Sequence, residues 1–330
     1  MRRRRVERSQ GGTFMIIRRR RTLRGALAAT AATVALTATA GTAFASGDPA
    51  GAERARATAE AEAGRQAPGG QRASASAAAE APVETPSFSM SAVDKQTKKL
   101  YLYHPNRAGA FGPRDLVDVE FDAFADTIPV DDDKDGWSDG SWYWNKNGTL
   151  SFSWISDDLQ YHQNEIGGGW NTYRMLVSPG SIGGAKEADL LGVDKAGVLW
   201  SYLAYPEGRL TPRTRVGGGW DQYDQLEGQG DLTGDGKPDV VARDRSGGLW
   251  LYRGTGDYKA PFAGRTKIGG GWNVFDRILS VGDLDADGRT DLIARKPNGD
   301  LLRYSGTGSA TNVFQKPVKI GSGFQIYNLL

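Results

Sequence analysis

Three short acidic segments contain the residues of this sequence that could do chemistry. Residues 131–139, 231–239 and 283–291 fit the pattern D-x-[DT]-x-D-G-x-x-D. Alternate side chains at positions 1, 3 and 5 point inward to one cation, Gly at position 6 permits a sharp turn, and the position-7 carbonyl adds an oxygen ligand. Such hard oxygen ligands predict calcium as the cofactor. The predicted metal ligands are Asp131, Asp133, Asp135, Asp139, Asp231, Thr233, Asp235, Asp239, Asp283, Asp285, Asp287 and Asp291.

Two other interpretations of these segments are weaker. EF-hand loops need Glu at position 12 and flanking helices, but position 12 here is Trp142, Ala242 or Ala294, within stretches that favour strands. Plain Asp/Gly turns are the simpler alternative, yet three or four carboxylates within nine residues repel one another unless a cation neutralises them. A fourth aligned segment, residues 181–189, keeps only Asp189, so we expect no metal there.

The element Ile/Val-Gly-Gly-Gly-Trp recurs along the chain. It ends at Trp170, Trp220 and Trp272, and a divergent copy ends at Phe324, so the aromatic positions are 50, 52 and 52 residues apart. Phe121 marks a fifth and most divergent copy. Each unit contains four short apolar runs separated by Gly/Asn turns, which predicts antiparallel β-meanders.

Units of four strands at this period predict an all-β fold, a five-bladed β-propeller of four-stranded blades. The ends of the repeat region support this fold. The segment from residue 87 supplies only the second, third and fourth strands of a blade, whereas residues 325–330 supply only a first strand. We expect the C-terminal strand to close the ring on the N-terminal strands, because closure removes exposed sheet edges.

The acidic segments and their flanks resemble FG-GAP/VCBS-type repeats of secreted bacterial proteins. The resemblance is strongest over Gly230–Val241 and Gly282–Ile293, and integrin α-subunit propellers have the same cation loop. The five-fold count and the Gly-Gly-Gly-Trp element are also similar to tachylectin-type five-bladed lectin propellers. The resemblance covers residues 87–330 and implies a calcium-bearing propeller. Phe at positions 121 and 324, and the lost loop at 181, depart from the pattern.

The N-terminal residues predict export. Residues 18–24 are rich in Arg, a weakly apolar Ala-rich stretch follows, and Ala43-Phe44-Ala45 is a small-x-small cleavage pattern. Residues 1–45 are therefore a predicted signal peptide, cleaved after Ala45, rather than a membrane anchor. Residues 46–86 lack aromatic residues, which predicts a disordered Ala/Glu/Pro-rich tether. The propeller then spans residues 87–330 of a secreted, extracellular protein.

The composition excludes several function classes. Ten of the 41 Lys and Arg residues and one of the 39 Asp and Glu residues precede Ser46, so the remainder has 31 basic and 38 acidic residues, a net charge of −7. An acidic chain has no electrostatic reason to bind nucleic acid or an anionic membrane. The absence of Cys excludes disulfides and thiolate sites. No motif surrounds His104 or His162, so we predict that the protein is not an enzyme. We also expect it to be a monomer.

We favour multivalent, lectin-like carbohydrate binding, because aromatic rings beside polar groups can stack on sugars. The alternative for these repeated rings is packing between blades, and Trp154, Trp200 and Trp250 are expected in the core. Two other functions stay open: an extracellular protein-interaction or adhesion scaffold, and a non-catalytic accessory subunit of a secreted enzyme. Partners would be glycans or cell-surface proteins. The candidate ligand-binding residues are Trp170, Asn171, Trp220, Asp221, Trp272 and Asn273.

Overall fold

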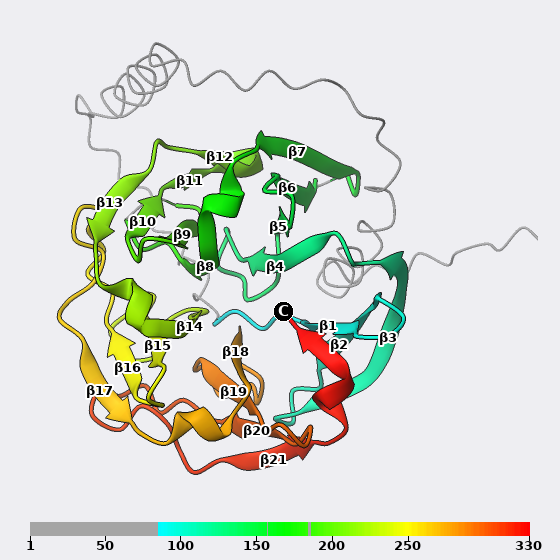
Figure 1. Cartoon of the computed structure of the whole chain (residues 1–330), viewed down its shortest axis with the longest axis vertical. Coiled ribbons are helices and arrows are strands. Elements are labelled where there is room, and N and C mark those ends of the chain that lie inside the picture. The colour runs from blue at the N-terminus through cyan, green and yellow to red at the C-terminus, as the bar shows by residue number, and fades with distance from the viewer. Residues whose placement is uncertain (1–84, 157, 184–185) are drawn as a thin grey trace, which may run out of the picture.

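A computed structural model describes residues 85–156, 158–183 and 186–330. The predicted signal peptide (1–45) and nearly all of the predicted tether (46–86) lie outside the described residues. Five sheets, each of four antiparallel strands, surround a central axis (Figure 1). The predicted all-β, five-bladed propeller is confirmed.

The strands of each blade follow from the axis outward. Blade 1 contains β22 (Tyr327–Leu329), β1 (Met90–Asp94), β2 (Lys99–Pro105) and β3 (Phe111–Glu120). Blade 2 contains β4 (Phe124–Val130), β5 (Gly140–Asn145), β6 (Leu150–Ile155) and β7 (Tyr161–Gly167). Blade 3 contains β8 (Tyr173–Gly180), β9 (Asp189–Asp194), β10 (Leu199–Tyr202) and β13 (Thr214–Gly217). Blade 4 contains β14 (Tyr223–Glu227), β15 (Val240–Asp244), β16 (Leu249–Tyr252) and β17 (Thr266–Gly269). Blade 5 contains β18 (Arg277–Gly282), β19 (Asp291–Arg295), β20 (Leu301–Tyr304) and β21 (Val318–Gly321).

Between β10 and β13 the chain forms a small ribbon, β11 (Ala204–Tyr205) and β12 (Arg209–Leu210), around the 3-10 turn η3 (Pro206–Gly208). The other helices of the described residues are single 3-10 turns that precede the first strand of blades 3, 4, 5 and 1. They are η2 (Trp170–Thr172), η4 (Trp220–Gln222), η5 (Trp272–Val274) and η6 (Phe324–Ile326). None of the described helices is long and apolar enough to cross a membrane.

Ring closure follows the prediction. Strand β22 pairs antiparallel with β1, and Ala92 lies opposite Leu329. The last strand of the chain is thus the innermost strand of the blade that the first strands begin (Figure 1). This pairing ties the two ends of the repeat region together and gives blade 1 the same four strands as the other blades.

The first strand of blade 5 begins later than the sequence predicts. In blade 5 the run from Val274 to Val281 suggests a strand, but β18 begins at Arg277. The preceding residues form η5, because Gly271 has a φ of 77° and the Phe275 N–H bonds back to the Trp272 carbonyl. A left-handed glycine of this kind turns the chain before the strand begins.

The hydrophobic core lies between neighbouring blades. One cluster combines Val177 and Leu191 of blade 3 with Leu226 and Val240 of blade 4. Four similar clusters fill the other interfaces. Burial between blades fixes each sheet relative to the next, and so it also fixes the loops at the ends of the strands.

Candidate functional site

The three acidic loops occupy equivalent places in three blades. Residues 131–139 join β4 to β5, residues 231–239 join β14 to β15, and residues 283–291 join β18 to β19. Each loop therefore connects the first strand of its blade to the second, and all three lie at the same end of the ring. Their positions are those the repeat predicts.

Carboxylate oxygens converge in two of these loops. Those of Asp131, Asp133 and Asp139 lie within 4.8 Å of one another. The same holds for Asp283, Asp285 and Asp287. Among the described residues, the loop with Thr233 at position 3 forms no such cluster of three acids. The structure thus brings together six of the predicted ligands as two compact oxygen clusters.

The glycine at position 6 folds each loop around its first aspartate. Gly136, Gly236 and Gly288 have φ angles of 84°, 80° and 83°, a backbone conformation that other residues rarely adopt. Their N–H groups donate to the position-1 carboxylate at 3.0, 2.6 and 2.8 Å. The turn therefore points the first carboxylate into the loop, as a cation site requires.

Two carboxylate oxygens support the presence of a cation. Asp131 Oδ1 and Asp285 Oδ1 are buried and have no hydrogen-bond partner. Burial raises the pKa of Asp131 to about 7, and Asp139, Asp135 and Asp133 push it in the same direction. A carboxylate in such surroundings is favourable in its charged form only beside a positive charge. The donor set therefore fits calcium, which takes six to eight oxygen ligands.

The aspartate at position 9 braces the loop. Asp239 accepts three backbone N–H groups, at 2.9 Å on Oδ1 and at 3.0 Å twice on Oδ2. Asp189, in the segment without the other acids, is fully buried and accepts two backbone N–H groups in the same way. This role explains why Asp189 persists where the other ligand residues are missing. The expectation that residues 181–189 bind no metal stays a prediction.

Two arginines lie against carboxylates of the 283–291 loop. Arg303 Nη2 lies 3.0 Å from Asp285 Oδ2, and both side chains are largely buried. Arg289 Nη1 lies 3.5 Å from Asp287 Oδ2. Part of the negative charge that would attract calcium is therefore already neutralised at the 283–291 loop.

The repeated tryptophans lie between blades. Trp170, Trp220 and Trp272 are 8 %, 6 % and 8 % exposed. The backbone N–H of each donates at 2.9 Å to a glycine carbonyl in the preceding blade, and the Trp220 ring stacks on Tyr252 at 4.5 Å. These rings present little surface to a sugar and contribute mainly to packing.

The polar neighbours of these rings lie on the surface. Asn171, Asp221 and Asn273 are exposed. Each lies against a glycine of positive φ in the turn between the second and third strands of the preceding blade. The amide or carboxylate groups of these three residues are accessible, whereas the adjacent rings are buried. Sugar binding by the three residues stays a prediction.

A surface cluster that sequence analysis missed recurs in three blades. In each, an exposed arginine near the fourth strand lies over an aromatic ring of the third strand. We call these the arginine–aromatic clusters. They are Arg114 over Tyr101 at 4.5 Å, Arg213 over Trp200 at 4.0 Å and Arg265 over Trp250 at 4.2 Å.

An aspartate completes two of these clusters. The indole Nε1 of Trp200 donates to Asp194 at 2.8 Å, and that of Trp250 donates to Asp244 at 2.7 Å. Although burial opposes it, hydrogen bonds from Ser246 and Trp250 lower the pKa of Asp244 to about 2. Trp200 and Trp250, expected in the core, are only half-buried. Their recurrence with an arginine 13 or 15 residues later was the signal available in the sequence.

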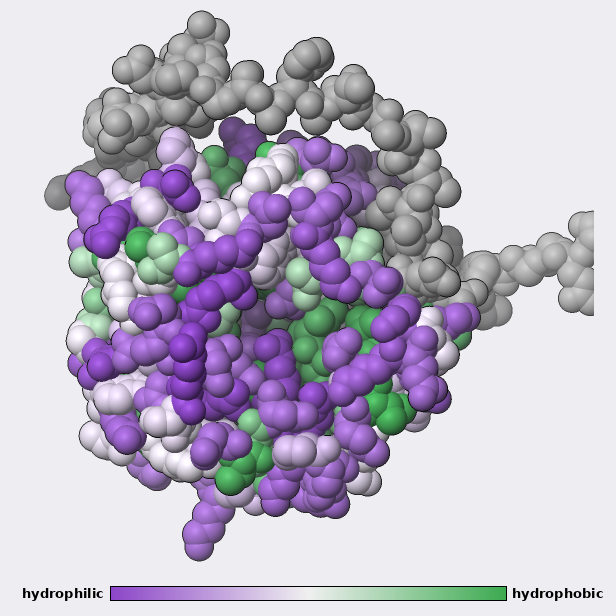
Figure 2. All heavy atoms as spheres, viewed as in Figure 1, coloured by the Kyte–Doolittle hydropathy of each residue, from purple (hydrophilic) through white to green (hydrophobic). Residues whose placement is uncertain are grey.

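A cavity of about 710 Å³ lies at the centre of the ring. The space-filling view shows the surface hollowed there (Figure 2). The first strands of the blades and the segment before β1 line it, and Asp126, Glu227 and Arg277 contribute charge. Arg277 Nη1 lies 3.4 Å from Glu227 Oε1. Burial raises the pKa of Glu227 to about 7 and that of Asp126 to about 6, while Arg277 opposes both shifts.

Ser89, His104 and Asp115 form a hydrogen-bonded row at the wall of this cavity. Ser89 Oγ lies 2.6 Å from His104 Nδ1, and His104 Nε2 lies 3.1 Å from Asp115 Oδ2. Sequence analysis saw no arrangement around His104, because Ser89 precedes β1 whereas His104 lies in β2 and Asp115 lies in β3. The Asp115 side chain is 68 % exposed, so water screens its charge. It would orient and stabilise the imidazole far less than the buried aspartate of a catalytic triad does.

Residues 231–294 match the family model described as an FG-GAP-like repeat. This stretch is an FG-GAP-like repeat. It contains the acidic loops at 231–239 and 283–291, and the resemblance expected from the sequence is confirmed there. The comparison with curated proteins found no match.

Several solved structures share the propeller arrangement. The BP39L lectin from Burkholderia pseudomallei is 13 % identical over 73 % of this chain and 71 % of that chain, with a TM-score of 0.44. AofleA from Arthrobotrys oligospora is 12 % identical over 74 % and 75 %, with a TM-score of 0.42. The periplasmic gluconolactonase PpgL from Pseudomonas aeruginosa is 13 % identical over 73 % and 69 %, with a TM-score of 0.38. Likeness at this level leaves the ligand of this propeller open.

Proposed function

We propose that this protein is an exported, calcium-stabilised propeller that binds carbohydrate at its arginine–aromatic clusters. The recurrence of one exposed cluster in three blades is the observation that supports this most directly. Repeated weak sites on one rigid ring gain avidity on a surface that presents many copies of a ligand. A glycan coat is such a surface.

The chemistry of a cluster suits a hydroxyl-rich ligand. Arg265 Nη1 donates to Gln222 Oε1 at 2.8 Å, which orients the guanidinium while the side chain stays exposed. Among the ion pairs between described residues, none involves Arg213 or Arg265. The planar guanidinium therefore keeps N–H donors for hydroxyl or carboxylate oxygens, and the adjacent Asp244 can accept a hydrogen bond from a hydroxyl group.

Calcium has a structural role in this proposal. Ser87, just before β1, donates its N–H to the Gly136 carbonyl at 2.9 Å and its hydroxyl to the Asp283 carbonyl at 2.7 Å. The segment that starts the ring therefore connects two acidic loops. A cation that orders those loops would also hold the point of ring closure, and binding only to the folded state stabilises it.

The test is a glycan array with matched arginine variants of the mature, calcium-loaded protein. The double variant R213A/R265A should lose most array binding, with a melting temperature near that of the wild type. The control R215A removes an exposed arginine of β13, two residues after Arg213, and should bind normally. If the wild type binds no glycan surface in calcium, the proposal fails, and a protein-interaction scaffold becomes the better explanation.

Export has its own test. Mass spectrometry of protein from the culture medium should find a mature N-terminus at or near Ser46, as the cleavage pattern after Ala45 predicts. Extracellular protein that retains the Arg-rich N-terminus would contradict this part of the proposal.

A further inference from the structure

Three charged side chains in the central cavity interrupt the repeat. Glu227 is in the first strand of blade 4. The residues at the equivalent position of the strand pairing in blades 2, 3 and 5 are apolar: Ile128, Val177 and Leu279. At the position of Arg277 and Asp126, blade 3 places Met175. Packing of the blades therefore does not require charge here, and burying charge costs free energy that a buried ion pair rarely recovers.

The three groups do not satisfy one another. The trio contains one guanidinium and two carboxylates. Arg277 Nη1 lies 3.4 Å from Glu227 Oε1, which is long for an ion pair. Arg277 Nε is buried and has no hydrogen-bond partner among the described residues. Asp126 accepts one hydrogen bond, from the Thr127 N–H at 2.9 Å. When both carboxylates are ionised the trio has a surplus of one negative charge.

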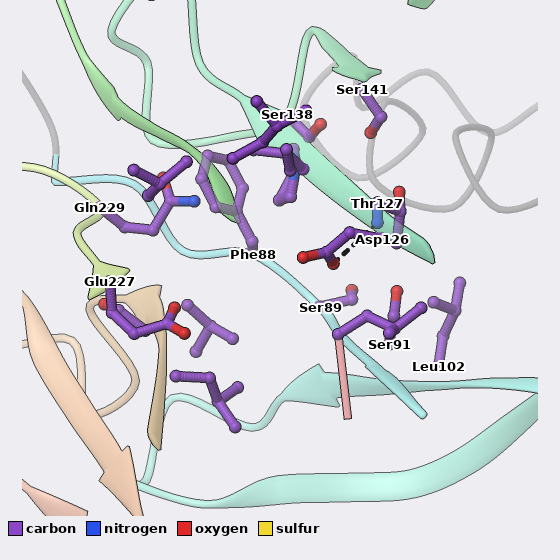
Figure 3. A pocket seen from close by; sticks show the side chains of 18 of the residues that line it. Phe88, Ser89, Ser91, Leu102, Asp126, Thr127, Ser138, Ser141, Glu227 and Gln229 are labelled. Carbon is purple, nitrogen blue, oxygen red and sulfur yellow. Dashed lines mark hydrogen bonds between the residues drawn. The ribbon is translucent and has the colours of Figure 1, made fainter. Parts of the chain in front are cut away.

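The other charged groups nearby are already engaged. Arg174 donates to two backbone carbonyls of the next blade, and Asp224 pairs with Arg243 at 2.8 Å. The trio thus faces the cavity with unused hydrogen-bonding capacity. Figure 3 shows Asp126 and Glu227 pointing into the cavity from different strands. The Glu227 and Arg277 side chains are 13 % and 25 % exposed, so solvent reaches them.

We propose that the central cavity binds a small amine that also bears hydroxyl groups, held between Asp126, Glu227 and Arg277. The ammonium would neutralise the surplus charge by donating to the two carboxylates. A hydroxyl oxygen would accept from the exposed part of the Arg277 guanidinium, and Gln229 and Ser91 line the same cavity. The volume of about 710 Å³ lies within the range of small-molecule sites. This site is separate from the arginine–aromatic clusters and does not depend on them.

The first experiment uses glucosamine as the probe and glucose as its uncharged counterpart, in calorimetric titrations of the mature protein at pH 7. Glucosamine should bind at least about tenfold more tightly than glucose, and E227Q should reduce its affinity by about tenfold, since loss of one charged hydrogen bond has roughly that effect. The control E165Q removes an exposed carboxylate of β7 and should leave the affinity unchanged. Equal affinities for the two sugars, or no glucosamine binding, would overturn the proposal.

A second variant separates binding from folding. Replacing the trio with the apolar residues of sister blades, as D126M/E227V/R277M, should abolish glucosamine binding and keep or raise the melting temperature, because apolar replacement of buried charges is often neutral or stabilising. A melting temperature more than a few degrees lower would instead show that the charges hold the ring together, and the proposal would be wrong.

Discussion

The acidic loops and the central cavity begin from the same inner strands, yet they relate to the repeat in opposite ways. The loops use equivalent positions in three blades. Even residues 181–189, which lack the other predicted ligands, keep Asp189, and its carboxylate accepts two backbone N–H groups. The charged trio of the cavity includes a residue that departs from its counterparts in the other blades, as Glu227 does from Val177 and Leu279. Features that every blade needs recur at the period of the repeat, whereas the candidate for a single central ligand lies where the symmetry is broken.

Removal of calcium should have the largest effect, because it acts on the repeated loops together. At free calcium 100 times the dissociation constant, each independent site stabilises the folded state by about 2.7 kcal/mol. Chelation should therefore lower the melting temperature clearly in calorimetry. The variant D283A/D287A should respond less to chelator than the wild type. Identical melting curves with and without chelator would show that the loops are plain turns.

The repeated tryptophans should matter for stability more than for binding. Trp220→Ala leaves a cavity between blades 3 and 4 and should reduce the free energy of unfolding by about 3–5 kcal/mol. The neighbouring exposed residue provides the control, since D221A should change stability little. Denaturant unfolding measures both. A near-normal stability combined with lost glycan binding would show instead that the ring forms a sugar site.

The central charges should make stability depend on pH. In the folded protein, burial and Asp126 raise the pKa of Glu227 from 4.5 to about 7, against the effect of Arg277. The folded state thus holds this proton more tightly than the unfolded chain does. Its stabilising contribution is complete below about pH 4.5 and is lost as the pH rises to 7. Over this interval E227Q should gain stability relative to the wild type, by on the order of 1–3 kcal/mol. A constant difference would contradict the assignment.

The smallest expected effect separates two loops that look alike in sequence. Arg303 neutralises part of Asp285, so R303Q should raise the calcium affinity of the 283–291 loop by about fivefold, or about 1 kcal/mol. Calorimetric titration of the three loops should show this change at the 283–291 loop alone. The control R245Q changes an exposed arginine outside the loops and should leave all affinities as they are. A lower affinity in R303Q would mean that the arginine orders the loop rather than competing with calcium.

The sequence by itself determined the architecture of this protein. The number of blades follows from the spacing of Trp170, Trp220 and Trp272, and ring closure follows from the strands missing at each end of the repeat region. The acidic loops were readable because their predicted ligands lie within nine residues of one another. Local spacing is enough to recognise a feature whose parts are all close together in the chain.

Only the tertiary structure decided which side chains meet across strands and blades. Trp220 is buried because the blade before it covers the ring, and Arg265 reaches Trp250 from the residue just before the neighbouring strand of the same sheet. Asp126, Glu227 and Arg277 share one cavity although they come from three blades. No local pattern encodes that meeting, because it depends on the angle through which each blade turns about the axis.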